Sequence, residues 1–411
     1  MMQKFFILSQ LISTIYGLEQ FSEETLNKHH YKKTYQLEFI PDNGSYLLSI
    51  QDINGNLFIN GTEGGEFRLE VLYKTNSFAD KKNINQIKDD EMNISHLEED
   101  KIIQINTVSN PIHFDITKSY YIYLPSYIHL NIDIIGGDIY LSSIHGTVNI
   151  LTNGGNIDID GLSGKINANT SAGDLNLKNI DGSIRLHTNN GDITVINSSG
   201  NFYTSTSGGN LSFKYINGDI KAQNYAGSIS LKDINSKSII INNTGGLLLC
   251  QNIISNIKIK NYNNKTKLLD IIGNVDINNS NSDIYINHLS GKLNCQLTVG
   301  NIEGKQISGS IDVFSTVGDI LMELNYNTQI DDYGIYLETN AGDITLKIPS
   351  RLSANIDAII MKSNIIQNLN SDFLISTQIT EAGVVGNGSI GLGTIPIKLR
   401  STLGEINIEK E

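Results

Sequence analysis

Glycine recurs at every ninth position in Gly155-Asn-Ile-Asp-Ile-Asp-Gly-Leu-Ser-Gly164-Lys-Ile-Asn-Ala-Asn-Thr-Ser-Ala-Gly173, and this spacing is the strongest indication of the fold. The spacing holds without a miss from Gly137 to Gly227. A fixed short period over this length is typical of one small unit repeated many times. We interpret the repeated glycines as turn positions, where glycine supplies positive φ at no steric cost. They are Gly137, Gly146, Gly155, Gly164, Gly173, Gly182, Gly191, Gly200, Gly209, Gly218 and Gly227, then, after one extra residue, Gly246, Gly273, Gly291, Gly300, Gly309 and Gly318, with Ser255, Asn264 and Ser282 in the gaps.

Between these glycines, apolar and polar residues alternate. The second residue after each glycine is almost always apolar and the fourth is mostly so, as in Gly191-Asp-Ile-Thr-Val. Alternation with a period of two is typical of a strand that has one buried and one solvent-exposed face. Each nine-residue unit therefore predicts a strand of about five residues followed by a glycine turn.

A slower rhythm distinguishes successive units. Two residues before the glycine, one series is apolar, as at Ile144 and Leu162, and the alternate series carries a hydroxyl or an amide, as at Asn153 and Ser171. The apolar corner is expected to point inward. The polar side chains of the other corner are expected to bond the local backbone as Asx or ST turns. The full repeat is therefore eighteen residues with two unlike halves.

An eighteen-residue coil with two strand faces predicts an all-β fold, a single-chain parallel β-solenoid in which identical positions stack about 4.8 Å apart. We expect it to be right-handed, as parallel crossovers generally are, and to have irregular β caps at both ends. The alternative is an antiparallel meander with a hairpin turn at each glycine. A meander gives no reason to keep consecutive turns the same length, whereas stacking does.

Four sections are predicted along the chain. Residues 1–20 form a signal peptide, residues 31–125 an N-terminal β cap, residues 126–326 the repeat array, and residues 327–411 the last β coils and the C-terminal cap. Strand-like runs such as Leu57-Phe-Ile-Asn support the assignment of the first cap. The charged stretch at residues 80–101 interrupts them and is expected to be a solvated loop or a short helix.

The N-terminus has the features of a secretory signal peptide: Lys4, a short and mostly apolar run from Phe5, and the small residue Gly17. The alternative is an ordinary buried N-terminal strand or helix. No other stretch approaches the roughly eighteen apolar residues of a membrane-spanning helix. We therefore expect an exported protein, secreted, periplasmic or at the cell surface, with no transmembrane helix in the mature chain.

Composition excludes some classes of partner and chemistry. A net charge of −13 without a Lys/Arg cluster argues against nucleic acid, because phosphate binding needs a basic face. Cys250 and Cys295 fall at inward strand positions on different halves of the coil, so each is expected to be a free, small hydrophobe. The histidines show no ligand spacing beyond the His29-His30 pair. We predict no cofactor and no metal, and the pattern leaves the oligomeric state open.

A column of Asp and Asn follows the glycines of the polar corner. Stacked carboxylates repel one another unless they are solvated, hydrogen-bonded or metal-bound. Calcium is one alternative, but one Asp per turn supplies too few oxygens for a calcium cage. We predict instead an exposed turn ladder whose Asp side chains accept backbone N–H hydrogen bonds. Its members are Asp138, Asn156, Asp174, Asp192, Asn210, Asp283, Asn301, Asp319 and Asp343.

Asp158, Asp160 and Asp174 are the best local group for a β-helix enzyme, a polysaccharide lyase or hydrolase, which needs two or three converging carboxylates. Their outward neighbours are Asn, Thr, Ser and Lys rather than the basic and aromatic residues of a sugar cleft. No catalytic residue is therefore predicted. Outward tyrosines, which suit contact with a partner but are equally normal on a β face, are Tyr140, Tyr203 and Tyr285.

Several lines of the sequence carry a resemblance to a known family. They are Thr188-Asn-Asn-Gly-Asp-Ile-Thr-Val, Thr170-Ser-Ala-Gly-Asp-Leu-Asn-Leu, the closing Ile397-Lys-Leu-Arg-Ser-Thr-Leu-Gly-Glu-Ile-Asn-Ile, and Tyr123-Leu-Pro125 ahead of the array. Residues 45–411 resemble the bacterial adhesin-like family with a toastrack-like β-helix, which is related to the head GIN adhesin domains. Residues 351–385 depart from the family's pattern.

The resemblance implies an exported, non-enzymatic binding, adhesion or envelope-associated scaffold. Its partner would be a protein or glycan at the cell surface, and the family has no shared catalytic residues to carry over. Two alternatives stay open, a carbohydrate-active β-helix enzyme and a purely structural spacer. The residues themselves show only an acidic scaffold with polar faces, since a fold does not by itself imply a function.

Overall fold

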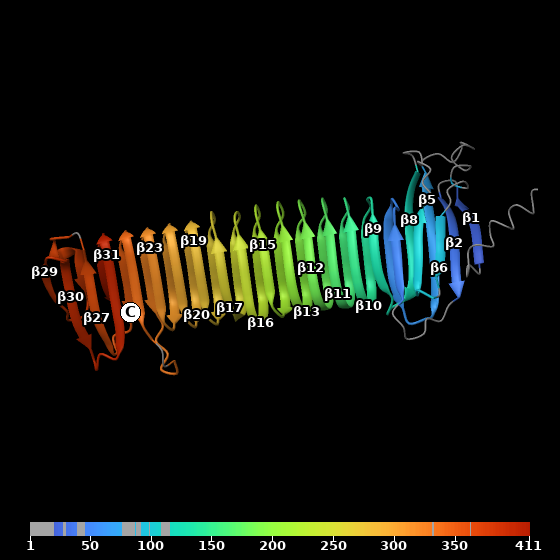
Figure 1. Cartoon of the computed structure of the whole chain (residues 1–411). Coiled ribbons are helices and arrows are strands. Elements are labelled where there is room, and N and C mark those ends of the chain that lie inside the picture. Colours follow the sequence, from blue (N-terminus) through green and yellow to red (C-terminus); the bar gives the residue numbers. More distant parts are fainter. Residues whose placement is uncertain are drawn as a thin grey trace, which may run out of the picture. The chain divides into compact units, whose positions relative to one another are not determined.

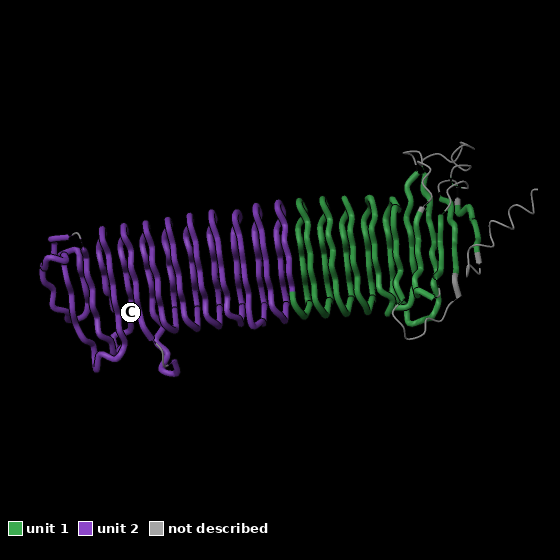
Figure 2. Tube along the Cα trace, in the orientation of Figure 1, with its two compact units in different colours: residues 1–201 green, residues 202–411 purple. Residues whose placement is uncertain are grey.

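The computed structural model describes residues 20–27, 30–38, 46–75, 87, 92–97, 99–107, 116–330, 333–361 and 363–411. The chain divides into two compact units, unit 1 in residues 1–201 and unit 2 in residues 202–411 (Figure 2). Within each unit, strands lie side by side and make up most of the structure (Figure 1). The predicted signal peptide lies outside the described residues, apart from Gln20 at the start of the first strand.

The strands of unit 1 begin in the N-terminal cap and continue into the repeat array. They are β1 (Gln20–Asn27), β2 (His30–Glu38), β3 (Leu47–Gln51), β4 (Asn56–Thr62), β5 (Glu66–Thr75), β6 (Met92–Leu97), β7 (Ile102–Thr107), β8 (Ile116–Pro125), β9 (His129–Ile134), β10 (Ile139–Thr152), β11 (Ile157–Thr170), β12 (Leu175–Thr188) and β13 (Ile193–Thr206). The chain passes into unit 2 within β13.

Unit 2 contains the rest of the array and the C-terminal cap. Its strands are β14 (Leu211–Asn217), β15 (Ile220–Asn224), β16 (Ile229–Asn243), β17 (Leu248–Asn261), β18 (Thr266–Ile272), β19 (Val275–Asn281), β20 (Ile284–Ser290), β21 (Leu293–Val299), β22 (Ile302–Ser308), β23 (Ile311–Val317), β24 (Ile320–Leu324), β25 (Ile335–Ala341), β26 (Ile344–Ile348), β27 (Ala354–Ile360), β28 (Leu369–Ser371), β29 (Ser376–Thr380), β30 (Gly383–Ile390), β31 (Ile395–Leu403) and β32 (Ile406–Lys410). A 3₁₀ turn, η1 (Ile366–Asn368), precedes β28.

Successive coils pair in parallel at an offset of eighteen residues. Ile157 pairs with Ile139 on one side and with Leu175 on the other in unit 1, and Val275 pairs with Leu293 in unit 2. All of these side chains are buried, so each apolar column forms a continuous part of the core. The parallel β-solenoid is confirmed, and the antiparallel meander is excluded. The right-handed coil stays a prediction.

The two corners of a coil differ more than the glycine spacing predicts. Strands β10, β11 and β12 each run unbroken for 14 residues, so the chain bends at the apolar corner without leaving the ladder. The bend is made by a residue in the left-handed region, Ser143 with φ 56° or Asn179 with φ 56°. The buried Ile144 and Ile180 follow directly. The prediction of a short strand with a glycine turn at each end is therefore wrong at this corner.

The polar corner is capped one residue earlier than predicted. Asn153 and Ser171 are exposed. The buried Thr188 instead donates from Oγ1 to Gly173 O at 3.0 Å and accepts from Gly191 N at 3.1 Å. A buried hydroxyl that both donates and accepts satisfies two backbone groups that would otherwise be costly to bury. The capping column is Thr152, Thr170 and Thr188 in unit 1 and Thr206, Asn224, Asn243, Asn261 and Asn279 in unit 2.

At the N-terminal end, strand order in space departs from strand order in the chain. Strand β4 lies between β8 and β10, and β3 lies between β7 and β9. Strand β6 pairs antiparallel with β7 and buries Met92 and Ile94. The prediction of a loop or short helix for residues 80–101 is therefore wrong at residues 92–97, because flanking charges hide a short run of period-two alternation.

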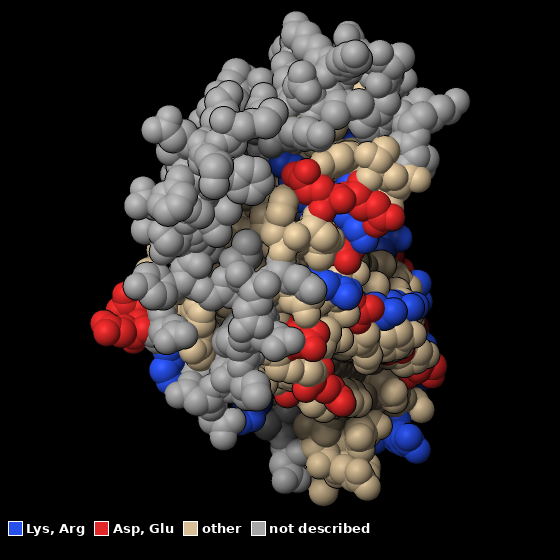
Figure 3. All heavy atoms as spheres, turned by 90° about the vertical axis from the view of Figure 1, so that its right-hand side faces the viewer, with Lys and Arg blue, Asp and Glu red and all other residues tan. Residues whose placement is uncertain are grey.

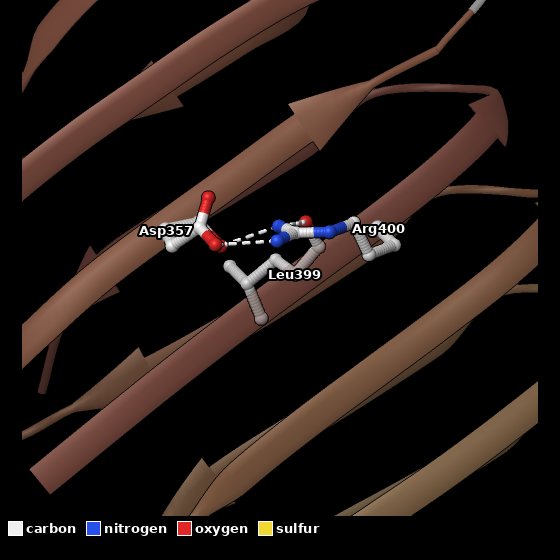
Figure 4. Close-up of polar contacts among 3 residues, drawn as sticks. All are labelled: Asp357, Leu399 and Arg400. Atoms are coloured by element: carbon white, nitrogen blue, oxygen red, sulfur yellow. Dashed lines mark hydrogen bonds and ion pairs between the residues drawn. The ribbon is translucent and has the colours of Figure 1, made fainter.

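At the C-terminal end, the chain leaves the stack and then returns to it. Strands β31 and β32 pair with β25 and β26, while β27 covers β31 and continues antiparallel into β30 and β29. Arg400 of β31 donates to Leu399 O at 3.0 Å, to Asp357 O at 2.8 Å and to the Asp357 carboxylate of β27 (Figure 4). The segment at residues 351–385, which departs from the repeat pattern, thus contributes the strands that cap the last coil.

The extra residue in the array is accommodated as a bulge. Pairing of β16 with β17 shifts between Asn235 and Ser238. The Asp219 carboxylate accepts both Lys237 N and Ser238 N at 3.0 Å through one oxygen. The side chain thus holds the two N–H groups that the bulge takes out of the ladder, and the eighteen-residue register continues beyond it.

Charge on the described part of the N-terminal end of unit 1 is mixed. Acidic and basic side chains are interspersed there (Figure 3). Lys32 and Arg68 lie 3.9 and 3.6 Å from the Glu70 carboxylate. In the part of the chain that the structure describes, no helix has the length and apolar character needed to cross a membrane.

Candidate ligand-binding groove

Unit 1 carries a groove of about 540 Å³ on the outward face of β8, β4, β10, β11, β12 and β13. Neighbouring strands from β8 to β12 pair in parallel and in register, so outward residues form columns that run across the strands. The volume lies within the roughly 300–1,000 Å³ of small-molecule sites. One column reads Tyr121, Phe58, Tyr140, Asp158 and Asn176, and the next reads Tyr123, Asn60, Ser142, Asp160 and Lys178.

Three aromatic rings form a stack at one end of this groove. Phe58 of β4 lies between Tyr121 of β8 and Tyr140 of β10, with ring centroids 4.7 and 4.6 Å apart and interplanar angles of 6° and 4°. These distances match the strand spacing of about 4.8 Å, so in-register pairing is what brings the rings into contact. Each ring pair contributes about 0.5–1.5 kcal/mol beyond its buried area. The stack is therefore a firmly held apolar wall.

Beyond the rings, the same columns become polar. Asp158 accepts from Asn176 Nδ2 at 2.9 Å, and Asp160 accepts from Asn179 Nδ2 at 2.6 Å. Each carboxylate is held through one oxygen and keeps acceptor capacity on the other. Lys178, in register with Asp160, is the basic group of the groove. The floor can therefore accept hydrogen bonds from a ligand at two positions on one strand.

Tyr140 lies where the apolar wall meets this polar floor. Burial raises the pKa of its hydroxyl, and the Asp138 and Asp158 charges raise it further, with a hydrogen bond to Asp138 adding to the effect. The phenol therefore stays neutral at physiological pH. A neutral ring beside a carboxylate suits a ligand that has an apolar face and hydroxyl or amine donors.

Two of the three predicted carboxylates lie in the groove. Asp158 and Asp160 line it, whereas Asp174 lies in the turn ladder, where its Oδ1 atom accepts a backbone N–H of the next coil at 2.8 Å. The expectation that no aromatic residues neighbour this group is wrong, because Phe58 and Tyr121 are brought in by cap strands. Alternation marks both as outward residues, but the strand order that places them beside β10 is not visible in the repeat.

The three predicted outward tyrosines have different surroundings. Tyr140 belongs to the stack. Tyr203, in unit 2, is 46% exposed. Tyr285, also in unit 2, lies beside a hollow of about 390 Å³, with the Lys305 ammonium 5.9 Å from its ring centroid. Tyr140 combines an aromatic neighbour with carboxylates in the groove.

The predicted Asp/Asn column is a hydrogen-bonded ladder. In unit 1, Asp174 Oδ1 accepts Asp192 N at 2.8 Å, and Asp138 and Asn156 accept in the same way from the coils that follow them. In unit 2 the accepting residues are Asn210, Asp283, Asn301, Asp319 and Asp343. The predicted acceptance of backbone N–H groups is confirmed for these residues. Within the described ranges, no group of three or more His, Cys, Asp or Glu side chains is placed to hold a metal ion.

The repeated glycines lie directly against the backbone of the previous coil. A Cβ on Gly173 would lie 2.0 Å from Gly155 O, and one on Gly182 would lie 1.7 Å from Gly164 O. Gly182 also has φ 150°, whereas Gly173 is not among the residues with positive φ. The predicted reason, positive φ, therefore applies to only some of these glycines. Close approach of stacked backbones applies to both kinds.

Neither cysteine belongs to a site. Cys250 and Cys295 are buried and free, so the predicted inward positions are confirmed. Burial raises the pKa of Cys250 to about 12, and burial also raises that of Cys295. Both thiols are therefore protonated at neutral pH and unreactive. Of the predicted histidine pair, His29 lies outside the described residues, and His30 begins β2.

Comparison with known proteins places the chain in a family. The profile of the Toastrack DUF4097 family matches residues 198–409, which is more than half of the 411 residues. No curated protein matches. Among solved structures, the chain is similar to a putative cell adhesion protein from Clostridium sporogenes, with 12% sequence identity and a TM-score of 0.16, over 92% of this chain and 100% of that one. The groove of unit 1 precedes the matched residues. The chain belongs to the Toastrack DUF4097 family.

Proposed function

We propose that this protein is an exported, non-enzymatic, adhesin-like protein that binds a cell-surface glycan through the groove of unit 1. The observation that carries the proposal is the stack of Tyr121, Phe58 and Tyr140 beside Asp158 and Asp160 on one outward face. Sugar rings offer C–H faces that pack on aromatic rings and hydroxyls that donate to carboxylates. The groove provides both kinds of contact within one hollow.

The placement of the carboxylates supports binding rather than turnover. Asp158 and Asp160 are two residues apart on β11, so they face a ligand from the same side at a spacing of about 7 Å. Glycosidases place their two carboxylates on either side of the scissile bond. Each of these carboxylates is in addition held by an asparagine amide. Such a pair suits recognition of hydroxyl groups.

Export is proposed from the N-terminal sequence. Lys4, the apolar run from Phe5 and the small residue Gly17 are typical of a cleaved secretory signal. N-terminal sequencing of the native protein from fractionated cells tests it. We expect a mature chain that begins shortly after Gly17 in the secreted or envelope fraction. A cytosolic protein that retains Met1 would contradict export.

Glycan binding is tested on a glycan array and by calorimetry with the mature chain. Tyr140→Ala is expected to weaken binding about tenfold or more, as loss of a central aromatic contact does. Tyr285→Ala is the matched control in unit 2 and should bind like the wild type. Absence of any glycan ligand would favour the structural spacer. Release of new reducing ends that is lost in Asp158→Ala and Asp160→Ala would favour the enzyme.

A further inference from the structure

We infer that the groove receives the end of a glycan chain, with one terminal pyranose ring stacked on the open face of Tyr140. This inference rests on the proposed glycan binding and adds which part of the glycan is recognised. Three features carry it: the direction of the ring stack, the side on which the hollow lies, and the charge of the floor.

The direction of the stack limits how a sugar can pack on it. Phe58 has one face against Tyr121 and the other against Tyr140, with nearly parallel planes. The stack runs across the strands, because its members are in-register partners on β8, β4 and β10. Only the two end rings can offer a face to a ligand. A glycan that lies along the stack would meet ring edges, whereas a single ring at its end can continue it.

The hollow lies at the Tyr140 end of the stack. On the other side of Tyr121, the in-register residue is Glu70 of β5, whose carboxylate lies 3.6 Å from Arg68 Nε and 3.9 Å from Lys32 Nζ. None of these three charged residues lines the groove, which instead extends over β11, β12 and β13. The ring that receives the ligand is therefore Tyr140.

The floor beyond Tyr140 favours a neutral or amine-bearing sugar. A ring stacked there would lie about one strand spacing further on, at the level of Asp158. Asp158, Asp160 and Asn176 supply acceptors for its hydroxyls, while Lys178 is the lining cation. Two carboxylates against one ammonium leave a net negative floor. A uronic or sialic acid at this position would be repelled.

The size of the groove limits how many sugars contribute to affinity. Its volume of about 540 Å³ is that of a site for a small molecule, not of a cleft for a long polymer. Its last lining residues, Thr194 and Ile196, belong to β13. Affinity should therefore rise from one sugar to two or three and then stop rising.

The first test measures affinity against chain length. Cello-, chito- and β-1,4-galacto-oligosaccharides of one to six residues are titrated into the mature protein by calorimetry. In a series that binds, we expect Kd to change less than about twofold beyond the trisaccharide, and glucuronate-ended chains to bind more weakly. A Kd that keeps falling tenfold or more to the hexasaccharide, or tighter binding of glucuronate ends, would overturn end recognition but leave glycan binding standing. Absence of binding in every series and on the array would contradict the proposed function itself.

The second test compares the two tyrosines of the stack. Tyr140→Ala should weaken binding about tenfold or more, and Tyr121→Ala less than about threefold, because only Tyr140 offers its face to the ligand. Tyr140→Phe keeps the ring and should bind within about threefold of the wild type. Near-ultraviolet circular dichroism confirms that each variant is folded. Equal losses in Tyr121→Ala and Tyr140→Ala would show that the ligand lies along the stack and would overturn the inference.

Discussion

The outward faces of the two units have the same backbone arrangement and differ in their side chains. At the third position after the polar-corner turn, adjacent strands β18, β20 and β22 of unit 2 pair in register like those of unit 1. In unit 1, adjacent strands carry Tyr121, Phe58 and Tyr140 at this level. In unit 2 they carry Lys267, Tyr285 and Glu303. A ring stack therefore needs more than the coil geometry: it needs aromatic residues in consecutive strands.

The source of those aromatic residues is informative. Tyr140 lies in the repeat array, but Phe58 and Tyr121 come from β4 and β8 of the N-terminal cap. The array supplies a regular spacing, which is close to the distance at which aromatic rings stack. The cap supplies two of the three aromatic residues that stack at this spacing. The ring stack of the groove therefore forms where strands of the cap pair with the array.

Substituting a glycine that lies against the backbone of the previous coil should give the largest effect on stability. The effect should be equal in the two units. A Cβ on Gly182 of unit 1 would lie 1.7 Å from Gly164 O, and one on Gly291 of unit 2 would lie 2.2 Å from Gly273 O. Because the clashing atoms belong to the backbone, neither site can relax without disturbing the pairing of successive coils. Gly182→Ala and Gly291→Ala should each lower the free energy of unfolding by about 3 kcal/mol or more. Denaturant unfolding with hydrogen exchange read separately in each unit measures it.

Gly154→Ala is the matched control for this pair. A Cβ on Gly154 would meet only Ala172 O, at 3.9 Å, and the next coil already carries alanine at this position. We expect a change within about 0.5 kcal/mol. If Gly182→Ala were as mild as Gly154→Ala, close backbone approach would not be the reason for the glycine spacing.

Building a stack in unit 2 should remove the difference between the faces. Lys267→Tyr with Glu303→Tyr places a ring on either side of Tyr285 and forms two new ring pairs, which are together worth about 1–3 kcal/mol. The change also removes the exposed Lys305–Glu303 ion pair, whose contribution is small because solvent screens it. A net rise in the free energy of unfolding, measured with denaturant, is expected. The double leucine variant at the same positions is the control, and equal stabilisation by leucine would mean that stacking is not the cause.

The left-handed bend at the apolar corner offers a smaller test. Unit 1 uses Asn179 and Asn197 there, whereas unit 2 places Tyr215 at φ 57°. Tyr215→Asn should relieve about 1–2 kcal/mol of left-handed strain and lose about 0.5–1 kcal/mol from the Lys214 cation, 4.6 Å from the ring centroid. We expect a net stabilisation of about 0.5–1 kcal/mol. Asn197→Tyr in unit 1 should have the opposite sign, and two effects of the same sign would contradict the strain argument.

The sequence predicts the coil well because the evidence for it is local. Alternation around Ile157 identifies the buried face, and equal glycine spacing requires stacked coils. The residue that caps the polar corner is predicted one position too late. Thr170 and Ser171 are adjacent and both carry a hydroxyl, and only burial, which is known from the structure, distinguishes them. The bend at Asn179 is missed because asparagine adopts the left-handed region without a glycine.

Only some of the residues that line the groove are predicted from the sequence, because the others come from distant parts of the chain. Asp158, Asp160 and Tyr140 are singled out from one short segment of the array. Their aromatic neighbours Phe58 and Tyr121 are distant in the chain and become neighbours only because β4 inserts between β8 and β10. No periodic pattern encodes that insertion, since the cap strands do not follow the eighteen-residue spacing. A site at the junction of cap and array therefore needs the structure.

The smallest expected effect concerns the ionisation of Tyr140, where the groove of unit 1 combines burial with nearby carboxylates. Burial raises the pKa of Tyr140 above its ordinary value of 10.0, and the Asp138 and Asp158 charges add to the rise. Asp138→Asn removes one charge but keeps the oxygen that accepts Asn156 N at 2.8 Å in the ladder. The pKa of Tyr140 should therefore fall part of the way back in this variant, and NMR of labelled tyrosine rings measures it.

The sign of the linked stability change follows from the direction of that shift. Because the folded-state pKa of Tyr140 is raised, its neutral form contributes stability that is complete below the ordinary pKa and is lost as the pH rises through the folded-state pKa. In Asp138→Asn this loss should be smaller and complete at a lower pH, because the folded-state pKa is lower, and in Tyr140→Phe it should be absent. If Asp138→Asn titrates like the wild type, the Asp138 charge does not contribute to this pKa, and burial together with Asp158 sets it.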